Sequence, residues 1–314
     1  MLETAFLAAV LALAAAAATP AAPTTPGTPA TPAAATPAPS PATPKGNFTA
    51  IPDLAYAEAG GQKLLLDLYM PLKAEKPPLV VYIHGGGWRQ GDRKKPTFIL
   101  WLVERGYAVA SLDYRLSQTA TFPAQIHDCK GAVRWLRAHA AQYGYNAERI
   151  AAVGGSAGGY LALLLGVTGD SKELEGDVGG NPTQSSRVQA VVDFYGPTDF
   201  VLRSGDQPQE TEKKGGKVYS LLGKAVQSDL ELAKRASPAF HVTKDDAPLL
   251  MFHGTADKTV LMNQAERIRD AYTAAGLPVE FHVIEGGGHG GPAYDTPPCR
   301  EPTLKFLEKE LKGK

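Results

Sequence analysis

Residues 149–166 read RIAAVGGSAGGYLALLLG, an apolar run that passes through a serine flanked by glycine pairs into a longer apolar run. The first run predicts a strand and the second a helix. A sharp strand-to-helix turn strains its central residue and brings neighbouring chains close, so Gly154 and Gly158 leave room where a side chain would clash. We therefore expect the hydroxyl of Ser156 to stand at a sheet edge, near the positive end of a helix.

Runs of strand length alternate with stretches of helical period after residue 50. Several of the apolar runs are continuous, which is typical of strands covered on both faces of a parallel sheet. The expected strands cover residues 63–70, 78–86, 107–114, 149–155, 187–196, 248–254 and 279–286, and the expected helices cover 123–142, 156–167, 260–275 and 297–311. This alternation predicts an α/β fold with a doubly wound, mostly parallel sheet. The long polar segment 200–236 predicts a small lid over the carboxyl edge of that sheet.

The composition excludes several classes of partner. Of the 314 residues, 44% are hydrophobic, and 32 Lys and Arg balance 32 Asp and Glu. This balance, with no basic stripe or polybasic segment, argues against nucleic acid or an anionic membrane surface as a partner. Cys129 and Cys299 have no metal-like spacing, and no Cys, His and Asp cluster has ligand spacing. We therefore expect neither a metal nor an organic cofactor.

The first fifth of the chain differs from the rest. Residues 5–18 are uninterrupted apolar, which is the length of a signal-peptide core and short of a membrane span. We expect a signal peptide over 1–19 and a secreted or periplasmic protein, with a retained membrane tether as the alternative. Residues 20–46 are rich in Pro, Thr and Ala, which predicts a disordered linker. The folded domain is expected over 47–314.

The Gly-x-Ser-x-Gly pattern at 154–158 makes Ser156 a candidate nucleophile. The alternative is a glycine-rich turn that binds a phosphate or only packs tightly. A second signal, YIHGGGWRQGD at 82–92, follows another strand with three consecutive glycines. Attack on a carbonyl needs backbone N–H groups aimed at the developing oxyanion, and glycine leaves them accessible. The expected donors are the amides of Gly86, Gly87 and Ala157.

A serine hydroxyl needs a base, and the base needs an acid to orient it. His289 lies in the glycine-rich loop EGGGHGGP after the last expected strand, where it should reach the same sheet edge as Ser156. Asp257 follows another strand in HGTAD, with a helix N-cap as the alternative interpretation. Along the chain the three residues come in the order Ser, Asp, His, which is a known order of catalytic triads.

The other histidines have simpler interpretations. His84 is expected to brace the glycine loop, His127 and His139 to face solvent, and His253 and His282 to be buried in strands. His241 adjoins the expected lid and stays open as a base. Trp88 and Tyr160 are the candidate residues for contact with substrate, although for Trp88 simple packing is the alternative.

With these motifs assembled, residues 50–312 resemble the α/β-hydrolase superfamily. The stretches HGGGW, GGSAGG, HGTAD and GGGHG are most similar to those of carboxylesterases, among them hormone-sensitive-lipase-like enzymes and the bifunctional feruloyl/acetyl-xylan esterase group. The former usually carry a helical N-terminal cap, which the Pro-rich segment here does not supply, and this favours the latter. The resemblance implies that Ser156, Asp257 and His289 are nucleophile, acid and base. It also implies that Asp113, Arg115 and Asp128 are scaffold residues near the site, with surface salt bridges as the alternative.

The expected function is therefore that of a serine carboxylesterase that hydrolyses small acyl or aryl esters, with acetyl or feruloyl esters of plant polysaccharide as the substrates that the resemblance implies. An amide-cleaving serine hydrolase, such as an arylformamidase or a prolyl-type peptidase, is one alternative. An inactive secreted binding module is the other. An exported chain meets oxidising conditions, so the pairing of Cys129 with Cys299 stays open.

Overall fold

The structure is a computed structural model that describes residues 43–45, 47–94, 96 and 98–313. Contacts divide the chain into two units, Met1–Thr36 and Pro37–Lys314, and all described residues belong to the second. The expected signal peptide and residues 20–42 of the expected linker lie outside the described residues, so both stay predictions. The last part of the expected linker, Thr43–Lys45, forms a short strand that pairs with Phe48–Ala50. No helix in the described part of the chain combines the length and the apolar character needed to cross a membrane.

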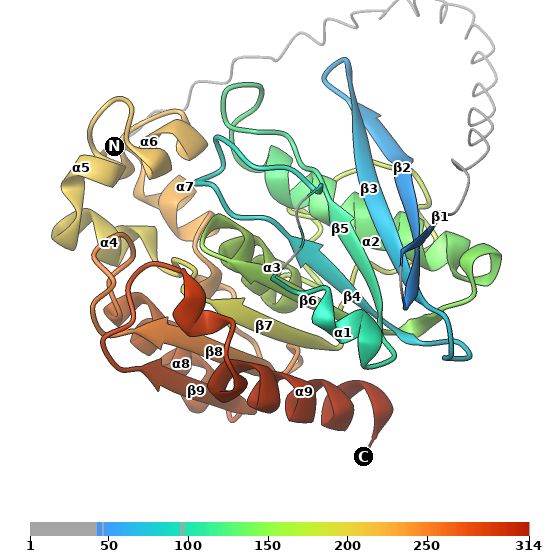
Figure 1. The fold of residues 1–314 in the computed structure, drawn as a ribbon. Helices are drawn as coiled ribbons and strands as arrows, with labels where there is room; N and C mark the ends of the chain where they lie inside the picture. Colours follow the sequence, from blue (N-terminus) through green and yellow to red (C-terminus); the bar gives the residue numbers. More distant parts are fainter. Residues whose placement is uncertain (1–42, 46, 95, 97, 314) are drawn as a thin grey trace, which may run out of the picture. The chain divides into compact units, whose positions relative to one another are not determined.

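The described residues form one nine-stranded mixed sheet in the order β1-β2-β3-β5-β4-β6-β7-β8-β9 (Figure 1). The first four strands in this order pair antiparallel, and every pairing from β5 to β9 is parallel. This confirms the predicted α/β class with a mostly parallel sheet. The strands are β1 (Thr43–Lys45), β2 (Phe48–Ala59), β3 (Gln62–Pro71), β4 (Pro78–Ile83), β5 (Ala108–Leu112), β6 (Asn146–Gly155), β7 (Ala190–Phe194), β8 (Leu249–Gly254) and β9 (Val279–Ile284).

Helices cover both faces of the sheet and enclose two apolar cores (Figure 1). One core joins the sheet to α2 (Ala124–Tyr143), α3 (Ala157–Val167) and α8 (Asn263–Ala274). The other joins it to α1 (Trp101–Glu104) and α9 (Pro297–Lys312). The parallel strands β5, β7 and β8 are buried along their whole length and β4 at every position but Tyr82, which explains why their sequences are continuous apolar runs rather than alternating ones.

The strand β2 has no counterpart among the expected elements. Its sequence is interrupted by Pro52, and Asp53 adopts a φ of 59° at a break in the β2–β3 register. Such a bulge breaks the period of two on which a strand prediction rests. The short helix α1 was likewise not expected, because four residues carry no helical period.

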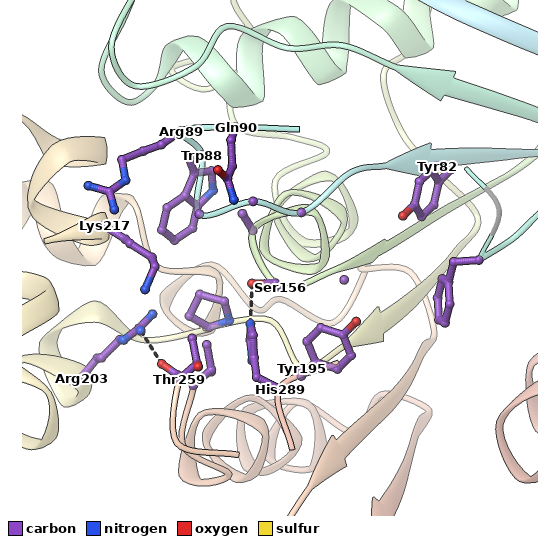
Figure 2. Close-up of a pocket in the computed structure, with 18 residues that line it drawn as sticks. Tyr82, Trp88, Arg89, Gln90, Ser156, Tyr195, Arg203, Lys217, Thr259 and His289 are labelled. Atoms are coloured by element: carbon purple, nitrogen blue, oxygen red, sulfur yellow. Dashed lines mark hydrogen bonds between the residues drawn. The ribbon is translucent and has the colours of Figure 1, made fainter. Parts of the chain in front are cut away.

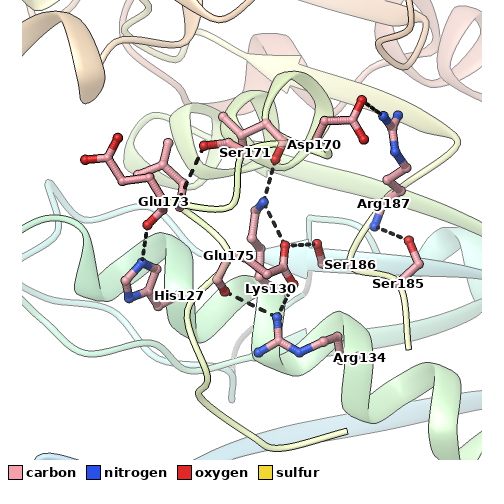
Figure 3. A network of polar contacts seen from close by, with 12 residues as sticks. His127, Lys130, Arg134, Asp170, Ser171, Glu173, Glu175, Ser185, Ser186 and Arg187 are labelled. Atoms are coloured by element: carbon pink, nitrogen blue, oxygen red, sulfur yellow. Dashed lines mark hydrogen bonds and ion pairs between the residues drawn. The ribbon is translucent and has the colours of Figure 1, made fainter. Parts of the chain in front are cut away.

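A buried polar network fixes the connection between α3 and β7 to α2 (Figure 3). Lys130 Nζ donates to the Thr168 carbonyl at 2.6 Å and to Glu175 Oε2 at 3.1 Å. Arg134 contacts the other oxygen of the same carboxylate, and Ser186 Oγ donates to Glu175 Oε2 at 2.7 Å. Burial lowers the pKa of the Lys130 ammonium and Glu175 partly offsets this, so the carboxylate makes the buried charge tolerable.

The segment between β7 and β8 folds into a series of short helices. These are α4 (Phe200–Asp206), α5 (Pro208–Thr211), α6 (Lys217–Leu222), the 3₁₀ turn η1 (Val226–Ser228) and α7 (Leu230–Arg235). They occupy the segment 200–236 that was expected as a lid. A Ser237 hydroxyl that donates to the Ala233 carbonyl and accepts from the Phe200 amide ties the two ends of the segment together.

The two cysteines are both free and buried, and they belong to cores on opposite faces of the sheet. Cys129 lies in α2 and Cys299 in α9, so the sheet separates them. The sequence left open whether they form a disulfide, and the structure shows two isolated thiols. Burial raises the pKa of both thiols, which reduces their reactivity further.

We therefore predict that unfolded, unreduced protein titrates two thiols per chain, whereas the native protein reacts slowly with a polar disulfide reagent. Denaturation without any reductant supplies the measurement. Fewer than two thiols in the unfolded chain would contradict the separation of the two helices by the sheet.

Candidate active site

The turn after β6 has the strained geometry that its sequence predicts. Ser156 has φ 56° and ψ −121°, and its amide donates to the Phe194 carbonyl at 2.8 Å. A Cβ on Gly154 would come within 2.3 Å of the Gly158 backbone, and one on Gly158 within 2.0 Å of the Ile83 carbonyl oxygen. These glycines therefore let the first turn of α3 lie against the ends of β6 and β4, with Ser156 at its tip.

Ser156, His289 and Asp257 form one chain of hydrogen bonds (Figure 2 shows the first link). His289 Nε2 lies 2.8 Å from Ser156 Oγ, and His289 Nδ1 lies 2.7 Å from Asp257 Oδ2. The three residues follow β6, β9 and β8, whose parallel carboxyl ends meet at one edge of the sheet. The Asp257 side chain is fully buried, and that of His289 is 21% exposed. The structure thus brings the three predicted residues together.

The Asp257 carboxylate is held from several directions. Its Oδ1 accepts hydrogen bonds from the amides of Thr259 at 2.8 Å and Val260 at 3.0 Å, while Oδ2 accepts from His289. Burial alone would raise the pKa of this carboxyl, but these hydrogen bonds outweigh it and hold the pKa below its ordinary value. An ionised carboxylate at this point fixes the imidazole with Nδ1 protonated and leaves Nε2 free to accept a proton.

The glycine loop after β4 lies beside the serine. A Cβ on Gly85 would approach Ser156 Cβ to 3.5 Å, and Gly86 and Gly87 have φ of 111° and 62°. Within the described part of the chain, no residue accepts a hydrogen bond from the Gly86 or Gly87 amide. Ala157 is the first residue of α3, where a helix amide has no acceptor one turn earlier. Unpaired amides beside a hydroxyl are what stabilisation of an oxyanion requires.

These residues line a cavity of about 500 Å³ (Figure 2). Trp88 forms part of its wall and is 2% exposed, with its ring packed edge-on against Tyr160 and Phe200. Tyr160, the other predicted substrate contact, is not among the lining residues. It is fully buried behind Trp88 and donates its hydroxyl to the Ala236 carbonyl at 2.7 Å. The structure therefore gives Tyr160 a packing position instead, because the helix position after Gly159 points into the core.

The remaining histidines have partners away from the serine. His84 stacks on Tyr114 with ring centroids 4.4 Å apart and lies under the glycine loop, as expected for a bracing residue. His253 is buried and lies 3.5 Å from Asp257 Oδ2, while His241 contacts the Arg235 carbonyl. The prediction that His282 is buried is wrong, since its side chain is 38% exposed. It lies on β9, the last strand of the described sheet, where its ring is covered on one side by Phe252 and otherwise reaches solvent.

The expected surface histidines are partly covered. His127 is half-buried and contacts the Glu173 carbonyl, and His139 stacks on Trp135 with centroids 4.0 Å apart. Both belong to α2, where more residues are buried than a one-faced helix would allow. The helix packs between the sheet and the connection that follows α3, so its outward face is covered too.

The residues Asp113, Arg115 and Asp128, expected as scaffold or as surface pairs, take part in buried pairing. Arg115 donates to Asp128, whose side chain is fully buried, at 2.6 Å. Asp113 accepts from Arg93, which also donates to Asp67 at 2.8 Å and contacts Asp53. Sequence reasoning missed Arg93, the centre of this cluster, although it directly follows the predicted glycine motif. The cluster fixes the far end of the loop that carries Gly86 and Gly87.

Asp193 is a second residue that sequence reasoning missed. It lies at the end of β7, fully buried, and accepts from the Gly196 amide at 3.0 Å. A Cβ on Gly159 would come within 2.1 Å of its Oδ1, so the carboxyl lies directly under the first turn of α3. Burial raises the pKa of Asp193 to about 8, partly offset by the Gly196 amide. A single Asp inside an apolar strand was the available signal.

Among the residues that the structure describes, no group of three or more His, Cys, Asp or Glu side chains could hold a metal ion. The chemistry of the cavity is that of a hydroxyl, an imidazole, a carboxylate and backbone amides. The fold and this arrangement together define an α/β hydrolase.

Comparison with known proteins narrows this class. The chain belongs to the BD-FAE family, whose model matches residues 66–272. Esterase LipC of Mycobacterium tuberculosis is 29% identical over 255 residues, covering 78% of this chain and 62% of LipC. The chain thus spans less than two thirds of that relative's length.

Solved structures are also similar over most of the chain, and two of them are carbohydrate-active proteins by their descriptions. A carbohydrate esterase from gut microbiota, in truncated form, has a TM-score of 0.78 and 27% identity, covering 87% of this chain and 100% of that one. A bifunctional GH43-CE protein of Bacteroides eggerthii has a TM-score of 0.76 and 33% identity, covering 83% of this chain and 35% of that one. The resemblance to α/β-hydrolase carboxylesterases drawn from the motifs is confirmed at the level of the family.

The protonated Asp193 predicts a pH dependence of stability. Because its folded pKa, about 8, exceeds the ordinary value near 4, the unfolded chain releases this proton first as pH rises. The contribution of this carboxyl to the free energy of unfolding is complete below about pH 4. It is lost as pH rises from about 4 through 8, at up to about 1.4 kcal/mol per pH unit. When urea unfolding is measured at pH 5 and at pH 7, the free energy of unfolding should fall by roughly 2 kcal/mol more in the wild type than in Asp193→Asn.

The matched control is Asp245→Asn, which removes an exposed carboxyl outside the site. It should lose stability with pH as the wild type does. Equal pH dependence in wild type and Asp193→Asn would show that the buried carboxyl ionises in the folded protein as it does in the unfolded chain.

Proposed function

We propose that this protein is a serine carboxylesterase that hydrolyses small acyl or aryl esters through an acyl-enzyme. One observation carries the proposal: the hydrogen-bonded chain Ser156–His289–Asp257 ends beside the amides of Gly86, Gly87 and Ala157 in a single cavity. A nucleophile, a base, an orienting acid and oxyanion donors are the parts that acyl transfer needs.

The proposed reaction begins with attack of Ser156 Oγ on the ester carbonyl carbon. His289 Nε2 takes the serine proton, and the carbonyl oxygen becomes an oxyanion bound by the glycine-loop amides. The intermediate then collapses, the C–O bond to the alcohol breaks, and His289 gives its proton to the departing oxygen. Water next attacks the acyl-enzyme with His289 again as base, which releases the acid and restores Ser156.

Asp257 has an electrostatic part in both steps. Its depressed pKa keeps it ionised at neutral pH, so it stabilises the imidazolium that forms when His289 accepts a proton. Because it is fully buried, its interaction with the imidazole is screened little by solvent. The nearby His253 stays neutral, since burial lowers its pKa, and so adds no competing charge.

Two observations support esters linked to plant polysaccharide as the finer substrate class. Two of the similar solved structures are a carbohydrate esterase and a bifunctional GH43-CE protein. The cavity also carries the aromatic side chains of Tyr82, Phe98 and Tyr195, which suit an aryl group such as a feruloyl ring. Acetyl and feruloyl esters are therefore the substrates to compare first.

We predict that Ser156→Ala lowers kcat/KM for 4-nitrophenyl acetate by at least about 10⁴-fold, and Asp257→Asn by about 10³- to 10⁴-fold, because each removes part of one catalytic unit. Release of nitrophenolate is the measurement. His282→Gln, which removes an imidazole on the outer strand β9, is the control and should keep wild-type activity.

Turnover that persists in Ser156→Ala would remove the proposal. Wild-type protein that cleaves no ester, with intact folding, would favour the inactive binding module instead. Faster cleavage of a matched anilide than of the ester would move the function to the amide-cleaving class.

A further inference from the structure

The cavity is chemically divided on either side of the serine (Figure 2). Tyr82 and Tyr195 lie on one side of Ser156, while the side chains of Arg89, Lys217 and Arg203 gather on the other. Among the described residues that line the cavity there are three Lys or Arg side chains and no Asp or Glu. Such an excess of one sign in a concave site attracts ligands of the opposite sign.

Arg203 is the most constrained of these cations. It lies in α4, is 2% exposed, donates through Nε to Gln207 Oε1 at 3.0 Å and through Nη2 to the Thr259 carbonyl at 2.7 Å. No carboxylate of the described chain lies within ion-pair distance of it. Burial lowers its pKa to about 10, against the more distant pull of Glu210 and Asp257, so it keeps its charge at neutral pH.

Both distant carboxylates are already engaged. Glu210 accepts hydrogen bonds from Lys217 Nζ and from the Lys217 amide, each at 3.1 Å, while Asp257 accepts one from His289. A buried guanidinium without its own carboxylate is costly, because desolvation of the charge is not repaid by an ion pair. The Arg203 fork therefore fits an anion that the chain itself does not supply.

Lys217 connects this cation to the reacting centre. It begins α6, and a Cβ on Gly87 would come within 2.8 Å of its Cδ, so its stem lies against the predicted oxyanion loop. Its side chain is one third exposed and can move toward a bound ligand. Arg89, whose Nη1 donates to the Gly215 carbonyl, holds the loop before α6 and adds a third positive charge.

We propose that this site selects esters that carry a carboxylate, and that Arg203 and Lys217 bind this carboxylate while Ser156 attacks the ester carbonyl. The inference rests on the proposed function and narrows its substrate class. The end of the Arg203 guanidinium, where Nη1 has no partner among the described residues, suits binding of a carboxylate, and Lys217 adds a mobile second contact. The carboxylate sits either on the acyl group, as in a dicarboxylic half-ester, or on the alcohol, as in an acetylated uronic acid.

Matched substrates separate charge from shape. On the acyl side, 4-nitrophenyl hemisuccinate is compared with 4-nitrophenyl 4-methylpentanoate, which has the same branching without the charge. On the alcohol side, acetylated glucuronic acid is compared with acetylated glucuronamide, with acetate release as the readout. After subtraction of uncatalysed hydrolysis, we expect kcat/KM to favour the anionic member of one pair by about tenfold or more at low salt.

Variants then show which side chains cause the preference for the anionic ester. Lys217→Gln should lower the anionic-to-neutral ratio of kcat/KM by about tenfold and Lys217→Arg should restore it, while Glu210→Gln should raise the ratio because it frees Lys217 from its partner. Arg203→Lys should lower the ratio as well. Lys214→Gln, an equal loss of charge at an exposed position of the same insertion outside the cavity, should leave it unchanged. The preference should also decline as sodium chloride rises.

Several results would overturn the inference. One is a ratio near one for both pairs, and another is a ratio that Lys217→Gln leaves unchanged. Equal losses on charged and neutral esters in Lys217→Gln would place the ammonium at the oxyanion instead. All three leave hydrolysis of neutral esters dependent on Ser156, and so leave the proposed function intact. Absence of Ser156-dependent hydrolysis of every ester would instead refute the proposed function, and this inference with it.

Discussion

The close approach of α3 to the ends of β4 and β6 is the constraint on which the site depends. Gly158 leaves no room for a Cβ against the Ile83 carbonyl, and Ser156 occupies a left-handed conformation that few side chains adopt. In this position the first turn of α3 can deliver both a hydroxyl and the free amide of Ala157 to one point. Any lateral shift of the helix would separate the nucleophile from the glycine loop that follows β4.

Sheet topology supplies the other components of the site. The segments that bear Ser156, Asp257 and His289 leave three parallel strands at their carboxyl ends, and β7 lies between the first of these and the other two. The end of β7 therefore lies under the serine turn, which is where Asp193 is buried. A carboxyl kept protonated there costs less than an ionised one, because no cation of the described chain pairs with it. The insertion that follows β7 begins at the same edge of the sheet, and its residues Arg203 and Lys217 line the cavity.

Local patterns were enough to predict the parts of the site that depend on strand ends. The apolar runs predicted β4, β6, β8 and β9, and because parallel strands share an edge, Ser156 and His289 could be expected to meet. Pairing partners could not be predicted in this way. Arg93 and Asp67 lie far apart in the sequence, and their meeting depends on the antiparallel pairing of β3 with β5. Tyr160 and His282 were placed wrongly because the side of a helix and the edge of a sheet are set by tertiary packing.

Arg93 and Arg203, two of the buried arginines in the described part of the chain, show how pairing separates structure from function. Arg93 is surrounded by three carboxylates from different strands and loops, so its charge is neutralised within the fold and its interactions hold the glycine loop in place. Arg203 is buried to the same degree but donates only to a side-chain amide and a backbone carbonyl. No ion pair within the fold offsets the desolvation of the Arg203 guanidinium, and an uncharged side chain of similar shape would cost less free energy in that place. The unpaired charge that faces Ser156 across the cavity is therefore better explained by what enters the cavity than by what stabilises the domain.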